Sequence, residues 1–338
     1  MIRLVQIANG SSRCVALVDE PALRILARVE SIYELASECI RDRASLTERV
    51  HLLATGESLS YDEVYGEKSG WHLLTPVDVP GAPEHVLVSG TGLTHLGSAK
   101  DRQAMHAEAA ATADKPVTDS MRMFQSGLAG GRPAPGEIGV APEWFYKGDG
   151  SMLQPPFAPL TVPAHAEDGG EEAEIAGIYI IDTDGAPFRI GMCAGNEFSD
   201  HEFERHNYLY LAASKLRPCS VGPELVIGGD FSAVKGAVSL ERDGQQLWRK
   251  DIETGEENMS HSLANLEHHH FKFAGHRRPG HVHVHFFGAH SLSFGEGIKL
   301  NSGDWMQVHF EGYGRALRNR IQIEAKERDR LMRVESLS

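Results

Sequence analysis

The stretch EEAEIAGIYIID, residues 171–182, limits the fold more than any other part of the chain. Side chains alternate along a strand, so residues two apart share a face. Glu172 and Glu174 therefore lie on the same face as Ala176 and Ile178. We expect both faces to be buried from Ala176 onward, which puts the two carboxylates side by side at the edge of a core. Two like charges at that distance need a positive partner or a shared proton.

A third acidic residue follows the next expected strand. After a turn at residues 182–185, a second strand runs to Gly195, and Glu197 comes directly after it. A hairpin would bring Glu197 back toward Glu172 and Glu174. Three carboxylates without cysteine suit a hard divalent cation, for which Mg²⁺ fits well and Mn²⁺ and Ca²⁺ are alternatives. Solvated acids at strand ends would give the same spacing.

Two lysines could balance this negative charge. Lys215 ends an expected helix, shortly before the turn at Gly222–Pro223, and Lys147 follows two aromatic residues. A lysine beside carboxylates compensates their charge, and acts as an acid or base if its pKa is depressed. A solvent-exposed lysine is the plain alternative for Lys147.

The composition is that of a soluble globular protein, with 338 residues, 41% hydrophobic and 24% charged. The formal net charge of −14 argues against binding to nucleic acid or to an anionic membrane surface. No apolar run is long enough for a membrane span or a signal peptide. The four cysteines show no zinc-binding spacing, so we expect a cytoplasmic protein with reduced thiols.

We expect a small N-terminal α/β cap domain over residues 1–83 and a catalytic domain over 84–338. The first 20 residues alternate around an NGSS turn, which predicts a hairpin, and residues 22–43 have helical spacing. Residues 91–135 predict a helix with loops that could cover a substrate. Short strands with glycine turns fill the second half and favour a barrel or folded sandwich.

The order of these motifs resembles that of the fumarylacetoacetate hydrolase superfamily, over roughly Glu84–Asn319. The matching residues are Phe145-Tyr146-Lys147, Glu172-Ala173-Glu174, Asn196-Glu197, Lys215, Gly222-Pro223 and Gly303-Asp304. The resemblance implies an α+β fold, a mixed β-roll or barrel with a small N-terminal α/β domain, and a homodimer. It also implies that Glu172, Glu174 and Glu197 hold the metal. Glu197 departs from the family's usual aspartate, which should shift the ion or the turn by the length of a methylene group.

Hydrolytic members of the superfamily carry an HxxE motif whose His–Glu pair activates water. Here His95 is followed three residues later by Ser98, and a histidine without its carboxylate is a poorer base. His95 could instead be a structural polar residue. The stretches MFQSG at 123–127 and SKLRPCSVGPELVIG at 214–228 look like the branch that acts on 2-keto-3-deoxy sugar acids.

That branch implies Mg²⁺-dependent dehydration of a 2-keto-3-deoxypentonate to 2-oxoglutarate semialdehyde in pentose catabolism. A divalent ion that chelates a 2-oxo acid acidifies the adjacent C–H, and Lys215 or His95 is the candidate base. Candidate substrate contacts are Lys147, Ser220, Gln125 and Ala289, with Arg102 as a further polar group. Three alternatives stay open: C–C hydrolysis of an acylpyruvate or diketo acid, decarboxylation through the same enolate, and a non-catalytic module that binds keto acids.

A histidine-rich segment offers a rival interpretation. His281, His283 and His285 share one face of an expected strand and could bind Zn or Fe in a cupin-like barrel. That interpretation leaves the order of the acidic motifs unexplained. A half-buried β face lined by histidines is the plain alternative.

Overall fold

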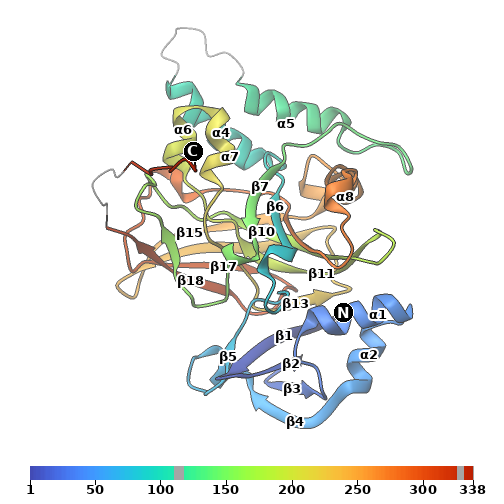
Figure 1. Cartoon of the computed structure of the whole chain (residues 1–338). Helices are drawn as coiled ribbons and strands as arrows, with labels where there is room; N and C mark the ends of the chain where they lie inside the picture. Colours follow the sequence, from blue (N-terminus) through green and yellow to red (C-terminus); the bar gives the residue numbers. More distant parts are fainter. Residues whose placement is uncertain (110–117, 326–330, 338) are drawn as a thin grey trace.

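The computed structural model describes residues 1–109, 118–325 and 331–337 (Figure 1). Two mixed sheets and a smaller number of helices confirm the α+β class. Neither sheet closes on itself in the described ranges, so the expected roll or barrel is not confirmed. No helix in these ranges is long and apolar enough to cross a membrane.

The larger sheet runs, in spatial order, through β4 (Ala54–Ser60), β3 (Ala22–Leu26), β2 (Ser12–Asp19), β1 (Ile2–Asn9), β13 (Leu225–Ile227), β11 (Pro187–Asn196), β10 (Ala173–Ile181), β16 (Val282–Phe286), β6 (Val86–Gly90) and β7 (Phe145–Asp149). Its side branches are β5 (His72–Leu73), β8 (Leu153–Gln154) and β12 (Cys219–Val221). The smaller sheet has the order β15 (Gln245–Thr254), β14 (Val234–Arg242), β17 (Trp305–Phe310), β18 (Leu317–Ile323) and β9 (Leu160–Val162).

The helices are α1 (Ile32–Asp42), α2 (Leu46–Leu53), α3 (Tyr61–Tyr65), α4 (Leu96–Ala109), α5 (Asp119–Gly130), α6 (His201–His206), α7 (Leu211–Ser214) and α8 (Leu263–Phe271). Helices α4 to α7 gather at one end of the molecule, and the N-terminal strands form the other end (Figure 1). The other strands of the two sheets lie between these two ends (Figure 1).

The N-terminal strands extend the larger sheet. The expected hairpin is present as β1 and β2, and β1 also pairs with β13, with Ile2 opposite Ile227. Residues 22–26 form β3 rather than the first turns of the expected helix, because β3 pairs with β2 across a tight turn. Tertiary pairing of this kind overrides local propensity. The helix begins only at Ile32, and the domain boundary at residue 83 stays a prediction.

Strand β10 is buried along its whole length and separates two cores. On one face, Ala176 and Ile178 pack in a cluster that includes side chains of α1. On the other face, Ile175 and Tyr179 join the cluster that packs against the smaller sheet. Burial of both faces explains the almost continuous apolar run in this strand.

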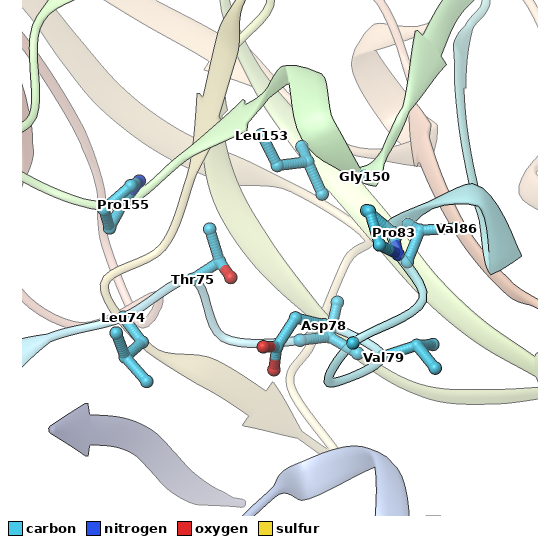
Figure 2. Close-up of a pocket in the computed structure, with 11 residues that line it drawn as sticks. Leu74, Thr75, Asp78, Val79, Pro83, Val86, Gly150, Leu153 and Pro155 are labelled. Carbon is cyan, nitrogen blue, oxygen red and sulfur yellow. The ribbon is translucent and has the colours of Figure 1, made fainter. Parts of the chain in front are cut away.

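A pocket lies where the segment after the N-terminal strands crosses to the main sheet (Figure 2). Most of its lining is apolar, including Leu74, Val79 and Leu153. The lining carboxylate of Asp78 accepts hydrogen bonds from Arg13, at 2.7 and 2.8 Å. The salt bridge ties this crossing segment to the N-terminal hairpin.

The histidines of β16 lie on the face that meets α8. Nε2 of His270, in α8, is 2.8 Å from Nδ1 of His283, and the ring of His285 lies between the hydroxyls of Ser89 and Thr91. Trp144 donates its indole N–H to Nδ1 of His270 at 3.1 Å. The described residues contain no cluster of three histidine, cysteine or acidic ligands here, so a cupin-like metal site is not found.

Burial of these histidines should make stability fall in acid. Burial is the main cause that lowers the pKa of His283 and of His285 to about 3. In the unfolded chain these histidines bind protons below about pH 6.5, whereas in the folded chain they stay neutral until the pH approaches 3. Their contribution to the free energy of unfolding is therefore complete above that pH and is lost as the pH falls toward 3. Each histidine contributes a slope of up to about 1.4 kcal/mol per pH unit.

Urea unfolding of the wild type and of His285→Asn, between about pH 7 and pH 5, measures this slope. We expect the free energy of unfolding of the variant to depend less steeply on pH, by up to about 1.4 kcal/mol per pH unit. Gln125→Asn, at an exposed site of α5, removes no ionisable group and is the control, which should keep the wild-type slope. Equal slopes for the wild type and His285→Asn would contradict the prediction.

Candidate active site

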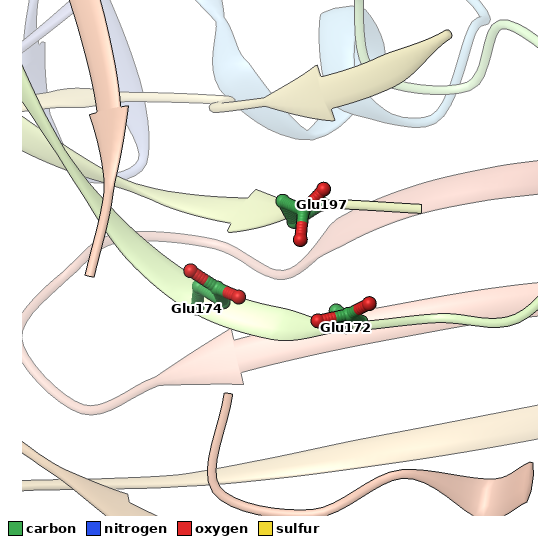
Figure 3. A group of neighbouring side chains, drawn as sticks. All are labelled: Glu172, Glu174 and Glu197. Atoms are coloured by element: carbon green, nitrogen blue, oxygen red, sulfur yellow. The ribbon is translucent and has the colours of Figure 1, made fainter. Parts of the chain in front are cut away.

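The three glutamates predicted from the sequence come together at one end of β10 and β11 (Figure 3). Glu174 lies in β10 opposite Gly195 of β11, and Glu197 follows the end of β11. The backbone N–H of Glu197 donates to the carbonyl of Glu172 at 2.9 Å, which closes the end of the hairpin. One carboxylate oxygen from each of the three residues lies within 4.8 Å of the others, and all three side chains are buried.

Both predicted lysines reach this cluster from other parts of the chain. Lys215, directly after α7, donates from Nζ to Oε1 of Glu172 and, at 2.8 Å, to Oε2 of Glu197. Nζ of Lys147, in β7, lies 2.7 Å from Oε1 of Glu197. Both lysine side chains are fully buried. A solvent-exposed Lys147, the plain alternative, is therefore wrong.

Three further groups orient the carboxylates, and sequence reasoning missed them. Nε2 of His201 lies 3.0 Å from Oε1 of Glu172, and Oγ of Ser199 lies 3.2 Å from Oε1 of Glu197. The backbone N–H of Gly288 donates to Oε2 of Glu174 at 2.6 Å. The short spacing in EFSDH, residues 197–201, is the one signal that could have pointed to the serine and the histidine.

The carboxylates differ in how strongly they hold a proton. Burial opposes ionisation of Glu172, but the charge of Lys215 and the contact with His201 outweigh it and hold its pKa well below the usual range. Burial and the charges of Glu197 and Glu172 raise the pKa of Glu174 well above its usual value. Burial and the charge of Glu172 also raise the pKa of Glu197, and Glu174 is the acid of the three that keeps a proton most readily.

The lysine and the histidine beside Glu172 respond to the same charges. Burial would lower the pKa of Lys215, but Glu172 and Glu197 overcome it and raise that pKa. Burial also opposes protonation of His201, yet Glu172 outweighs it and raises the pKa of the imidazole. Before a cation binds, Lys215 is therefore a proton donor rather than a base.

The donor set fits a hard divalent cation. Among the described residues, hydrogen bonds reach Oε1 of Glu172 and Oε2 of Glu174 but not the second oxygen of either carboxylate. These two oxygens are thus left for another ligand. Buried oxygen ligands without sulfur or nitrogen suit Mg²⁺, with Mn²⁺ and Ca²⁺ compatible.

His95 contacts hydroxyl groups rather than the three carboxylates. Nδ1 is 2.9 Å from the hydroxyl of Thr94 and Nε2 is 3.1 Å from that of Thr254. Burial, reinforced by His290, lowers the pKa of His95 to about 3. Ser98 donates its hydroxyl to the His95 carbonyl, and among the described residues the hydrogen-bond partners of the imidazole are hydroxyl groups rather than a carboxylate.

The predicted substrate contacts are dispersed. Ser220, in β12 opposite Asn196, donates its hydroxyl to the carbonyl of Gln154 at 2.8 Å. Gln125 is exposed on α5, and Ala289 is buried directly after Gly288. Arg102 forms 2.7 Å ion pairs with Glu143 and with Glu204, so its charge is already balanced.

No protein-family model matches the chain, and no curated protein matches its sequence. Solved structures show that the chain shares its fold with a sugar-acid dehydratase and with a fumarylacetoacetate hydrolase, in agreement with the motif order. A 2-keto-3-deoxyarabinonate dehydratase superimposes with a TM-score of 0.70 at 15% identity, covering 96% of this chain and 100% of that one.

Two other solved structures show the range of activities on this fold. A 2-keto-3-deoxy-D-arabinonate dehydratase complexed with magnesium and 2,5-dioxopentanoate gives a TM-score of 0.69 at 14% identity, over 96% of this chain and all of that one. A fumarylacetoacetate hydrolase from psychrophilic Exiguobacterium antarcticum gives 0.58 at 15% identity, with the same coverage of both chains.

The ion pair between Lys147 and Glu197 should contribute strongly to stability. Lys147→Met leaves a buried carboxylate without one of its partners and should lower the free energy of unfolding by about 3–5 kcal/mol. Adding Glu197→Gln should recover part of this loss, with a coupling energy of about 0.5–3 kcal/mol in a double-mutant cycle. Urea unfolding of all four proteins measures both quantities.

The matched control is Lys250→Met, which removes an exposed lysine paired with Glu296. It should change the free energy of unfolding by about 1 kcal/mol or less. Strictly additive effects of Lys147→Met and Glu197→Gln would contradict the predicted coupling.

Proposed function

We propose that this chain catalyses the Mg²⁺-dependent dehydration of a 2-keto-3-deoxy sugar acid, as a hydro-lyase. The specific reaction is the conversion of a 2-keto-3-deoxypentonate to 2-oxoglutarate semialdehyde, in pentose catabolism. The observation that carries the proposal is the buried group of Glu172, Glu174 and Glu197, balanced by Lys215 and Lys147. The fold shared with a dehydratase that binds magnesium supports it.

The three glutamates would hold the ion through carboxylate oxygens. When bound, a divalent ion supplies Lewis-acid polarisation of the ketone of a 2-oxo acid. Loss of a proton from C3 and of hydroxide from C4 then releases one water and leaves a carbon–carbon double bond, which tautomerises to the product.

The charges of the chain select an anionic substrate. The three carboxylates already face two ammonium groups and the imidazole of His201, so a divalent cation would add positive charge to a buried site where uncompensated charge is costly. An anionic 2-oxo acid would offset that charge.

Lys215 is the proposed proton-transfer residue. Its ammonium lies against Glu172 and Glu197 and 3.0 Å from the hydroxyl of Ser199. In that state it holds a proton at Nζ that could pass to the oxygen leaving C4, and the neutral amine so formed could take the proton lost from C3. His95, by contrast, is buried with both ring nitrogens next to hydroxyl groups, which makes it the weaker of the two candidates.

C–C hydrolysis of an acylpyruvate is the second candidate, because the same fold carries a fumarylacetoacetate hydrolase. It requires a base that activates water, and the contacts of His95 supply no carboxylate for that purpose. A module that binds keto acids without turnover is the third. The homodimer and the substrate contacts of Lys147, Ser220, Gln125 and Ala289 belong to the same proposal and rest on the resemblance.

Mass spectrometry of the products separates these candidates. The protein is incubated with Mg²⁺ and a panel of 2-keto-3-deoxy sugar acids and acylpyruvates. We expect a product lighter than a sugar acid by one water. Two fragments that sum to substrate plus water would establish the hydrolase instead, and Mg²⁺-dependent binding without turnover would establish the binding module.

Glu174→Gln should abolish both Mg²⁺ binding and turnover, because an amide oxygen is a poor substitute for a charged ligand. Calorimetric titration with Mg²⁺ and the product assay measure the two effects. Glu171→Gln is the matched control, since that neighbouring buried carboxylate accepts hydrogen bonds from Ser293 and lies outside the group of three. Full activity of Glu174→Gln at limiting Mg²⁺ would contradict the proposed site.

A further inference from the structure

We infer that His201 is a positioning residue that fixes the carboxylate of Glu172 so that one oxygen stays open to the metal. The inference rests on the proposed metal site and adds to it a residue that the motif order does not identify. His201 acts through Glu172, so its effect should appear in metal affinity before any substrate is present.

Two donors converge on the same oxygen of Glu172. Nε2 of His201 lies 3.0 Å from Oε1, and Lys215 donates to that atom as well. Because both contacts use Oε1, Oε2 of Glu172 carries no hydrogen bond among the described residues. The carboxylate is thereby held with one oxygen toward the protein and the other available to a cation.

The two donors are not equivalent once a cation arrives. The ammonium of Lys215 is shared with Glu197 and is positively charged before a cation binds, so a divalent cation on the same carboxylates would repel it. The imidazole of His201 can donate from Nε2 whether or not Nδ1 is protonated. It is therefore the donor that can keep Glu172 oriented in the loaded site.

The ring of His201 is held in place by close backbone packing. A Cβ atom at Gly170 would lie 2.4 Å from Nδ1 of His201, so only glycine leaves room for the ring there. Gly170 and Ser199 exchange backbone hydrogen bonds of 2.9 and 3.0 Å, which fixes the two segments against each other. The ring of Phe294 packs against the imidazole at 5.3 Å between ring centroids.

The hydrogen bonding of His201 is one-sided. The side chain is 2% exposed, yet Nδ1 has no hydrogen-bond partner among the described residues. A buried histidine kept only for stability usually satisfies both ring nitrogens. The single contact, to a predicted metal ligand, points to an orienting role. Outer partners of this kind commonly change metal affinity by about 10–100-fold when they are removed.

The test is calorimetric titration with Mg²⁺ alone, on the full chain, for the wild type and four variants. His201→Ala removes the donor, His201→Gln places an amide N–H near the position of Nε2, and His201→Asn keeps the amide but is too short to reach Glu172. The control is His206→Ala, an exposed histidine at the end of the same helix that pairs with Glu167. Thermal unfolding of each variant checks that it is folded.

We expect the Kd for Mg²⁺ to rise about 10–100-fold in His201→Ala and His201→Asn. His201→Gln should recover most of the lost affinity, and His206→Ala should match the wild type. A residue that only fills space would not show recovery by Gln without recovery by Asn. The comparison of these two variants therefore tests the inference even if His201→Ala fails to fold.

Two results would overturn the inference alone: wild-type Kd in His201→Asn, or equal weakening in His201→Gln and His201→Asn. Absence of Mg²⁺ binding by the wild type would instead overturn the proposed metal site, and the inference with it. The two failures are therefore distinguishable in one set of titrations.

Discussion

The burial of three carboxylates at one end of β10 is the constraint on which the rest of the structure depends. An unpaired buried charge costs several kcal/mol, so Glu172 and Glu197 can be buried only if positive groups arrive with them. Lys147 comes from β7 at the far edge of the larger sheet, and Lys215 from the end of α7. Both ends of the segment 145–215 must therefore meet at the glutamates when the chain folds.

The architecture around β10 follows from its burial on both faces. One face needs the cover that α1 and its neighbours supply, and the other needs the smaller sheet. Because β1 pairs with β13, the N-terminal strands are continuous with the sheet that carries the glutamates. The histidines of β16 face α8, on the opposite side of the sheet from Glu174, so the two polar clusters are separated by the sheet itself.

The parts of the site that depend on local periodicity could be predicted from the sequence. Alternation places Glu172 and Glu174 on one face, and a single hairpin brings Glu197 to them. Lys147 and Lys215 followed from the motif order. His201 could not be predicted in this way, because its contact with Glu172 depends on the pairing of Gly170 with Ser199, which no periodicity encodes.

The wrong or unconfirmed expectations share that cause. Residues 22–26 have helical spacing, but pairing with β2 makes them a strand, and the open sheets reflect long-range pairing that strand spacing alone does not determine. His95 stands where the resemblance implies a catalytic histidine; the structure places its ring nitrogens next to Thr94 and Thr254, and its catalytic role stays a prediction.

The same contacts that allow the site to fold also set what it can bind. Lys215 and Lys147 place two ammonium groups against Glu172 and Glu197, so these buried carboxylates have positive partners without any ligand. A divalent cation held by the three glutamates would add positive charge to this cluster, which an anionic substrate would offset. Cation and substrate should therefore bind more tightly together than either binds alone, since each removes the charge imbalance that the other creates. Under the proposed function, the same buried charges would both hold the site together without ligands and favour an anionic substrate.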